Sequence, residues 1–118
     1  MTSLIGAKVD ILVSTYGRTG KDREWRDEFR KKLREKGVMP KSVPQYSKLS
    51  VQIIFYLTDL FSKDIDNMIK LVLDAIFIDE AYRKNEPYLI NVDDNHVVSI
   101  VANKAEAEKE GIPIEICQ

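Results

Sequence analysis

The chain has 118 residues, of which 44% are hydrophobic and 31% are charged. This length and composition fit one globular domain with its own core and exclude a multidomain machine. The longest unbroken apolar run has five residues, 53–57. A membrane span needs roughly 20, so we expect neither a span nor a secretory leader. Cys117, the one cysteine, cannot form an internal disulfide, which favours a cytoplasmic protein.

The charges are distributed unevenly along the chain. The 18 basic and 19 acidic residues leave a net charge of −1, which by itself argues against a strongly cationic nucleic-acid binder. Residues 1–62, however, hold 12 Lys and Arg against 7 Asp and Glu, whereas residues 63–118 hold 6 against 12. This asymmetry indicates either a polar interaction surface or a functional cluster of acidic residues in the second half of the chain.

The first elements predicted are a strand, a loop and a helix. Residues 7–14 alternate and are rich in Val, Ile and Leu, which predicts a strand, and the glycine-flanked segment 15–20 predicts a loop. The helical period follows over 22–36, where three apolar residues form one face: Trp25, Phe29 and Leu33. Gly37 ends this helix, which we expect to pack on the core.

A second strand and a second helix follow. A connection with two prolines at 39–44 leads into a β-branched and aromatic strand at 49–58. A helix is predicted over 64–77, capped by Ser62 or Asp64. Its expected buried face consists of Ile65, Ile69, Val72, Leu73 and Ile76.

The last third of the chain mixes turns and strands. Residues 79–89 are polar and broken by a proline, and 91–95 read as a turn. Strands are predicted at 96–103 and 112–117, on either side of the charged stretch 104–110. The order β-α-β-α-β-β predicts an α+β fold, with two main helices packed on a small mixed β-sheet.

Acids are concentrated at two places in the second half. They are Asp64, Asp66 and Asp74, which flank Lys70 in the second helix, and Asp93 and Asp94 before the third strand. Positions 66, 70 and 74 are four apart and predict a polar stripe on one helix face. A strand beginning at residue 96 beside this helix is expected to bring Asp93 or Asp94 to the end where Asp64 lies. Carboxylates crowded in this way raise one another's pKa unless a cation neutralises them.

Such an acid cluster suits a hard divalent cation. Mg²⁺ or Mn²⁺ takes one or two carboxylates together with waters and phosphate oxygens, which predicts phosphodiester hydrolysis. Lys70, one turn beyond Asp66, is placed to hold the attacking water or to stabilise charge in the transition state. His96, the only histidine, is not required by this mechanism, and we expect it to point outward or to bond a turn.

Local rules offer a second interpretation of the same residues. Asp64 and Asp66 are also typical helix-capping acids, Lys70 and Asp74 an i,i+4 ion pair, and Asp93 a turn residue. On this reading the protein is a non-catalytic nucleic-acid or protein-binding module with a structural acid cluster. Local rules explain the acids of the helix and the Asp93-Asp94 pair separately, but they do not require both groups in one small chain. The presence of both groups therefore favours the metal site.

At these residues the chain resembles the RusA family of Holliday junction resolvases, small endonucleases of bacteria and their phages. The shared pattern is an acid-x-acid-Asn group, a lysine, an Asp-Ala-Leu-like triplet and an Asp-Asp pair leading into a strand. It is carried here by Asp64, Asp66, Asn67, Lys70, Asp74, Ala75, Ile76, Asp93, Asp94 and Val97. The resemblance covers residues 64–104, and chain length and element order agree with it elsewhere.

The resemblance implies one RusA-like endonuclease domain over 1–118. It would be a homodimer that uses Mg²⁺, or Mn²⁺ in its place, to cut four-way DNA junctions in recombination and repair. Asp64, Asp66 and Asp94 would be the essential metal-binding carboxylates, Asp93 a supporting metal-binding acid and Lys70 the catalytic lysine. Dimerisation has a physical reason, because a four-way junction is two-fold symmetric and needs two cuts.

Two departures from the family pattern leave another branched or nicked DNA open as the substrate. The chain lacks the usual Pro-rich opening, and residues 77–91 form a longer connection than expected. For phosphate contacts we predict a basic stripe on the first helix, made by Arg23, Arg26, Arg30 and Arg34. Arg18 and Lys21 in the preceding loop are further candidates. The other interpretation of the stripe is a solvent-exposed helix face on which acidic residues lie among the arginines.

Overall fold

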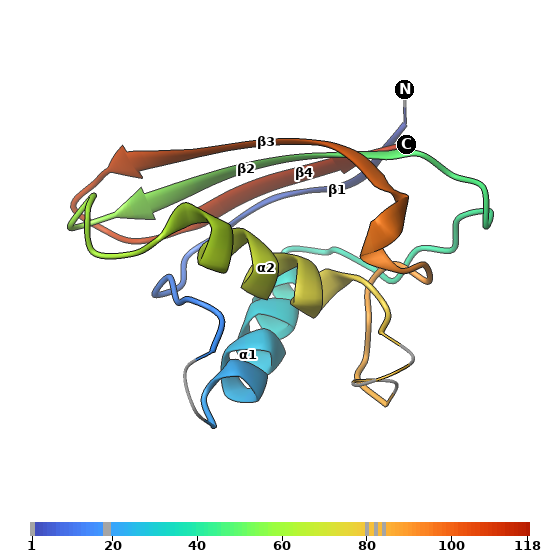
Figure 1. Ribbon diagram of the computed structural model, residues 1–118, viewed down its shortest axis with the longest axis horizontal. Helices are drawn as coiled ribbons and strands as arrows, with labels where there is room; N and C mark the ends of the chain where they lie inside the picture. The colour runs from blue at the N-terminus through green and yellow to red at the C-terminus, as the bar shows by residue number, and fades with distance from the viewer. Residues whose placement is uncertain (1, 18–19, 80, 82, 84) are drawn as a thin grey trace.

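The protein is built on one four-stranded sheet with two helices on a single face. The computed structural model describes residues 2–17, 20–79, 81, 83 and 85–118. Its elements are β1 (Ser3–Val9), α1 (Asp22–Glu35), β2 (Leu49–Leu57), α2 (Ile65–Ile76), the 3-10 turn η1 (Asp94–His96), β3 (Val97–Glu106) and β4 (Ile112–Cys117). The strands lie in the order β1-β4-β2-β3, and both helices lie below the sheet in Figure 1. The predicted α+β arrangement is confirmed.

The central unit is β2-α2-β3, whose two strands are parallel neighbours. Helix α2 connects them and therefore runs back against the strand direction, so that its C-terminal end lies near the start of β3 (Figure 1). Strand β4 pairs antiparallel with β2 and with β1, which makes β1 and β3 the edges of the sheet. This topology decides which side chains meet at the end of α2.

The core lies between the sheet and the helices. Every second residue of β2 is buried: Leu49, Val51, Ile53, Phe55 and Leu57. Phe29 and Leu33 of α1 are fully buried, and Trp25 stacks on Phe29 with ring centroids 4.9 Å apart. The predicted apolar face of the first helix is therefore confirmed. On α2 the buried set is shifted toward the C-terminal half, since Ile65 and Ile69 are only partly buried.

The first strand lies earlier in the chain than predicted, at Ser3–Val9 instead of 7–14. The reason is its partner, because β4 has six residues and its first residue, Ile112, pairs with Val9. Beyond that pair no strand of the sheet continues the ladder, although Ile11 and Val13 stay buried. The third strand is longer than predicted because β2 pairs with it as far as Glu106.

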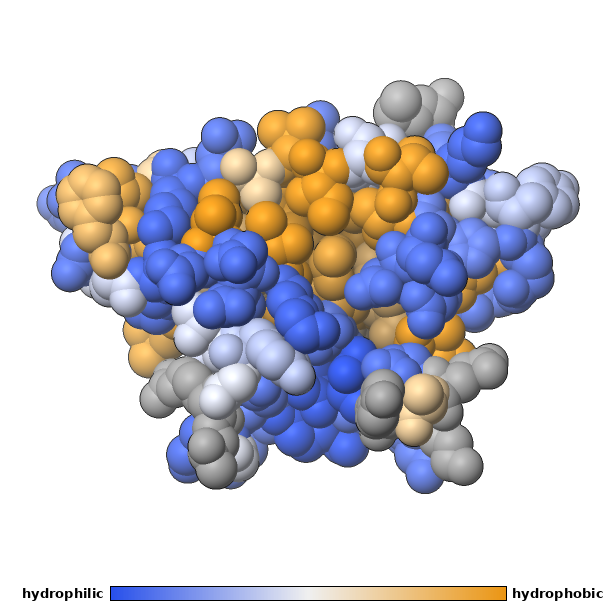
Figure 2. Space-filling view, in the orientation of Figure 1, coloured by the Kyte–Doolittle hydropathy of each residue, from blue (hydrophilic) through white to orange (hydrophobic). Residues whose placement is uncertain are grey.

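The two sides of the molecule differ in polarity. Figure 2 shows apolar side chains gathered along the sheet in the upper half of the view and mostly hydrophilic ones below, where α1 lies. Edge strand β3 contributes three exposed apolar residues, Val98, Ile100 and Val101. Among the described residues, no helix has the length and apolar character needed to cross a membrane.

Candidate functional site

An acidic pocket of about 140 Å³ lies between the C-terminal half of α2 and the start of β3. Its lining is Lys70, Leu73, Asp74, Phe77, Ile78, Asp79, Arg83, Asp93 and Asp94. Four carboxylates and two cations therefore line one small hollow. Larger hollows of about 450 Å³, on the open face of the sheet and beside Trp25, lie away from these residues. We place the candidate site in the small acidic pocket because its chemistry is concentrated there.

Chain topology explains which acids meet in this pocket. Asp93 and Asp94 were expected at the end of the helix where Asp64 lies, and that expectation is wrong. They lie beside the opposite half of α2, with Asp74, because a helix that connects two parallel strands delivers its C-terminus to the start of the second strand. The spacing of Lys70 and Asp74 along the helix still brings both side chains into the pocket.

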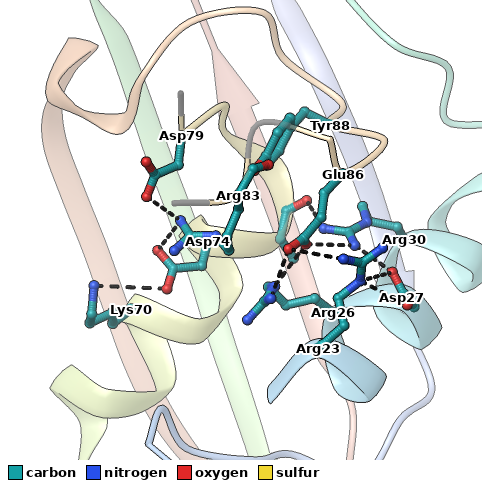
Figure 3. A network of polar contacts seen from close by, with 11 residues as sticks. Arg23, Arg26, Asp27, Arg30, Lys70, Asp74, Asp79, Arg83, Glu86 and Tyr88 are labelled. Carbon is teal, nitrogen blue, oxygen red and sulfur yellow. Dashed lines mark hydrogen bonds and ion pairs between the residues drawn. The ribbon is translucent and has the colours of Figure 1, made fainter. Parts of the chain in front are cut away.

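Asp74 is the buried acid of the pocket. Its side chain is only 3% exposed, although the predicted stripe placed it on the surface. Arg83 donates a hydrogen bond of 3.0 Å to its Oδ1, and Lys70 Nζ lies 3.8 Å from its Oδ2 (Figure 3). Oδ2 itself is buried and accepts no hydrogen bond from the described residues. Burial raises the pKa of Asp74, and the charges of Arg83 and Lys70 only partly oppose this.

Lys70 is held at the mouth of the pocket by two different contacts. Its ammonium lies 4.6 Å from the ring centroid of Tyr16, in the loop before α1, and 3.8 Å from Asp74. The loop is joined to α2 by the hydrogen bond from Tyr16 N–H to the carbonyl of Asn67, 3.0 Å long. The Lys70 side chain remains half exposed and so can reach a bound phosphate.

The Asp-Asp pair is organised by the turn η1. Asp93 is the N-cap of that turn, and its side chain accepts a hydrogen bond of 2.9 Å from the backbone N–H of Asn95. Asp94 is exposed as a residue, yet partial burial of its carboxylate and the adjacent Asp93 raise its pKa. His96 Nδ1 lies 3.0 Å from the carbonyl of Ser47, a hydrogen bond to the connection before β2.

The other two acids of the sequence pattern lie outside the pocket. Asp64 is the exposed N-cap of α2, whose side chain accepts no capping hydrogen bond from the described backbone, and Asp66 is exposed in the first turn. Eight residues separate Asp66 from Asp74, or about 12 Å along the helix axis, so one ion cannot bind both carboxylates. Across the described part of the chain, no three His, Cys, Asp or Glu side chains are arranged to hold one metal ion.

The predicted basic stripe on α1 is not continuous. Arg30 is completely buried and Arg26 is 7% exposed, so these two residues do not face solvent as phosphate contacts require, and that part of the prediction is wrong. Their neighbours Phe29 and Leu33 bring this side of the helix into the interior. Of the other candidates, Arg23, Arg34 and Lys21 are exposed, whereas Arg18 lies outside the described residues.

A second buried polar cluster was missed in the sequence and explains the buried arginines. Glu86, between α2 and β3, receives hydrogen bonds from Arg26 Nε at 2.9 Å and Arg26 Nη2 at 2.8 Å, and from Arg30 Nη2 at 3.0 Å (Figure 3). Arg30 also bonds Asp27 and the carbonyl of Ala75. The cluster ties the long connection after α2 to α1. Its one local signal was an arginine pair four residues apart beside an apolar stripe.

Arg83 was also missed, although Asp79 and Arg83 have the i,i+4 spacing of an ion pair. Arg83 Nη2 lies 3.1 Å from Asp79 Oδ2 and 3.0 Å from Asp74 Oδ1, and so joins the connection to the pocket. The Tyr88 hydroxyl donates a hydrogen bond to the Arg83 carbonyl and fixes the backbone there.

In comparisons with known proteins, no family model and no curated protein matches the chain.

Proposed function

We propose that the protein is a Mg²⁺-dependent endodeoxyribonuclease that resolves four-way DNA junctions by paired phosphodiester cleavage. One observation carries the proposal. Lys70 and Asp74 on α2 and the Asp93-Asp94 pair, about twenty residues further along the chain, line one small pocket. These are separate parts of the pattern that resembles RusA resolvases, and their convergence is what a shared chemical task would require.

The donor set of the pocket fits Mg²⁺. Carboxylate oxygens are the hard ligands that this ion prefers, and Asp74 Oδ2 is a buried oxygen that accepts no hydrogen bond from the described residues. The resemblance assigns metal binding to Asp64, Asp66 and Asp94, with Asp93 as a supporting acid. Of these, Asp93 and Asp94 line this pocket, whereas Asp64 and Asp66 lie outside it. When bound, Mg²⁺, or Mn²⁺ in its place, supplies Lewis-acid activation of the phosphodiester.

Charge stabilisation and DNA binding depend on side chains of the protein itself. Lys70, placed by Tyr16 and Asp74, presents a positive charge to the reacting phosphate and stabilises the negative charge that develops there. The exposed Arg23, Arg34 and Lys21 are candidates for phosphate contacts that orient the DNA. Buried Arg26 and Arg30 are not included in this surface.

The substrate determines the assembly that we propose. A four-way junction is two-fold symmetric, and the described residues of each protomer form one such acidic site, so paired cutting calls for a homodimer. Analytical ultracentrifugation tests this point, since a dimer has twice the chain mass of 13.6 kDa. Recombination intermediates and a lone cysteine both fit a cytoplasmic location.

A different function is favoured by one observation. Arg83 already forms ion pairs with Asp74 and Asp79 within the protein, as expected if the acids serve the fold of a non-catalytic nucleic-acid or protein-binding module. The two functions differ in chemistry, because the module binds DNA without breaking it. A nuclease that prefers another branched DNA keeps the same site and changes only the substrate.

The deciding experiment compares a synthetic mobile four-way junction with a matched linear duplex, in Mg²⁺ or in EDTA. We expect symmetric nicks in the junction, none in EDTA, and loss of cleavage in Asp94→Asn. Lys70→Ala is expected to slow cleavage by about 100- to 1,000-fold. Glu108→Gln, an exposed acid far from the pocket in the sequence, is the matched control. Tight junction binding without cleavage in any divalent metal contradicts the proposal.

A further inference from the structure

Asp74 has one carboxylate oxygen that the described residues leave without a hydrogen bond. Arg83 donates a hydrogen bond to its Oδ1, whereas Oδ2 is buried, accepts no hydrogen bond from the described residues and lies 3.8 Å from Lys70 Nζ. Asp74 is one of the residues that line the acidic pocket. Both oxygens of an ionised carboxylate accept hydrogen bonds or ligand a cation when they are removed from water. An oxygen in this state, on a residue that lines the same pocket as Asp93 and Asp94, indicates a position for a further cation.

Arg83 is attached to Asp74 less completely than an arginine usually is to a buried acid. A single nitrogen, Nη2, makes both of its ion pairs, at 3.0 Å to Asp74 and 3.1 Å to Asp79. The Nε atom is buried and has no hydrogen-bond partner among the described residues. A bidentate pair uses two nitrogens on two oxygens, as Arg26 does on Glu86. Arg83 therefore neutralises the acid without completing its hydrogen bonds.

We infer that Asp74 is a ligand for a divalent cation in this pocket and that Arg83 is the internal counter-ion that the cation displaces. The inference rests on the metal dependence of the proposed function and deepens it, because it names Asp74 as a ligand and Arg83 as the group that the ion displaces. Mg²⁺ binds through one or two carboxylates together with waters and substrate oxygens, so Asp74 and Asp94 suffice. Arg83 gives up Asp74 when the ion enters and keeps Asp79 as its partner.

The exchange predicts opposite effects of two substitutions on Mn²⁺ affinity, measured without DNA by electron paramagnetic resonance of free Mn²⁺. Removal of the competing charge in Arg83→Gln is expected to lower the Kd about tenfold, because a charge-assisted hydrogen bond no longer has to be broken. Removal of the ligand charge in Asp74→Asn is expected to raise the Kd at least about tenfold. Circular dichroism checks that each variant is folded.

Arg34→Gln is the matched control, since it removes one positive charge from an exposed position on α1. An equal gain in Mn²⁺ affinity in Arg34→Gln and Arg83→Gln would show a general charge effect and overturn the inference. Wild-type affinity in Asp74→Asn, or no Mn²⁺ binding by either wild type or Arg83→Gln, would also overturn it. If one of the two variants does not fold, the Mn²⁺ affinity of the other variant is sufficient to test the inference.

Failure of this inference is distinguishable from failure of the nuclease proposal. Junction cleavage that depends on Mg²⁺, with no change of Mn²⁺ affinity in either variant, refutes the role of Asp74 and Arg83 and leaves the nuclease intact. The predicted changes of Mn²⁺ affinity without any DNA cleavage retain the cation site and refute the nuclease.

Discussion

Two buried carboxylates, Glu86 and Asp74, lie close to the connection between α2 and β3 but differ in how many hydrogen bonds they accept (Figure 3). Glu86 receives three hydrogen bonds from two arginines, so that both of its oxygens are bonded. Asp74 receives one hydrogen bond, from Arg83, and its second oxygen receives none from the described residues. One acid is enclosed by its partners and the other faces a pocket.

The pKa values of the two acids shift in opposite directions for this reason. Burial alone would raise the pKa of Glu86, but the hydrogen bonds and charges of Arg26 and Arg30 outweigh burial and lower it. For Asp74 burial prevails over Arg83 and Lys70, and the pKa is raised. The fold thus stabilises the anion at Glu86 and leaves the anion at Asp74 incompletely compensated. This contrast assigns a structural role to Glu86 and is the basis for the proposal that Asp74 binds a cation.

The largest effect is expected from breaking the Glu86 cluster. Glu86→Gln leaves buried Arg26 without its ion-pair partner and Arg30 with Asp27 alone, and loss of one partner of a buried ion pair typically costs about 3–5 kcal/mol in the free energy of unfolding. Urea denaturation measures this loss. Glu28→Gln, an exposed acid in an i,i+4 pair on α1, is the control and is expected to change stability by about 0.5 kcal/mol or less. Equal effects in the two variants would contradict a structural role for Glu86.

The same cluster predicts how stability depends on pH. Because the pKa of Glu86 is lower in the folded protein than the usual value of about 4.3, its contribution is fully present above that value. The contribution is lost as the pH falls through the lower, folded pKa. The stability difference between wild type and Glu86→Gln should therefore shrink below about pH 4 in denaturation series. A difference that stays constant down to pH 2 would argue against this linkage.

Asp74→Asn is expected to have a smaller effect on stability than Glu86→Gln. In EDTA the neutral amide removes an incompletely compensated buried charge, while Arg83 keeps Asp79 as a partner. The free energy of unfolding should stay within about 1 kcal/mol of wild type or rise. Denaturation in EDTA measures it, and a loss comparable to that of Glu86→Gln would assign Asp74 to the fold as well.

The smallest effect is expected at the surface of α1 and separates exposed from buried arginines. Arg34→Ala should leave stability unchanged and reduce the slope of log affinity against log salt for DNA by about 0.9, the share of one phosphate contact. Fluorescence anisotropy over a salt series measures the slope. Arg26→Ala should instead destabilise the protein, because the side chain is buried with Glu86. A slope unchanged in Arg34→Ala would remove this residue from the DNA surface.

Features fixed by local periodicity could be predicted from the sequence. Both helices lie where expected, and Phe29 and Leu33 face the core. The first strand was misplaced because the residues around Ile11 are as apolar as those of β1, and only the length of β4 decides which of them pair. Strand boundaries therefore depended on a partner more than 100 residues away.

The site was predicted in part. Lys70, Asp74, Asp93 and Asp94 do line one pocket, but the meeting of the Asp pair with the far half of α2 follows from the parallel β2-β3 pairing, which no local pattern reveals. The burial of Arg26 and the contact of Arg83 with Asp74 depend on how the connection after α2 folds back. Such long-range ion pairs have no period in the sequence.

The central claim is that Asp74 binds a divalent cation whereas the Glu86 cluster is structural. Anomalous scattering from crystals of the wild-type protein grown with Mn²⁺ tests this claim most directly. We predict a Mn²⁺ peak at coordination distance from Asp74 and Asp94, with the Arg83 side chain moved off Asp74 and the Glu86 cluster unchanged. Full occupancy of Mn²⁺ elsewhere, with Arg83 still bonded to Asp74, would contradict the account.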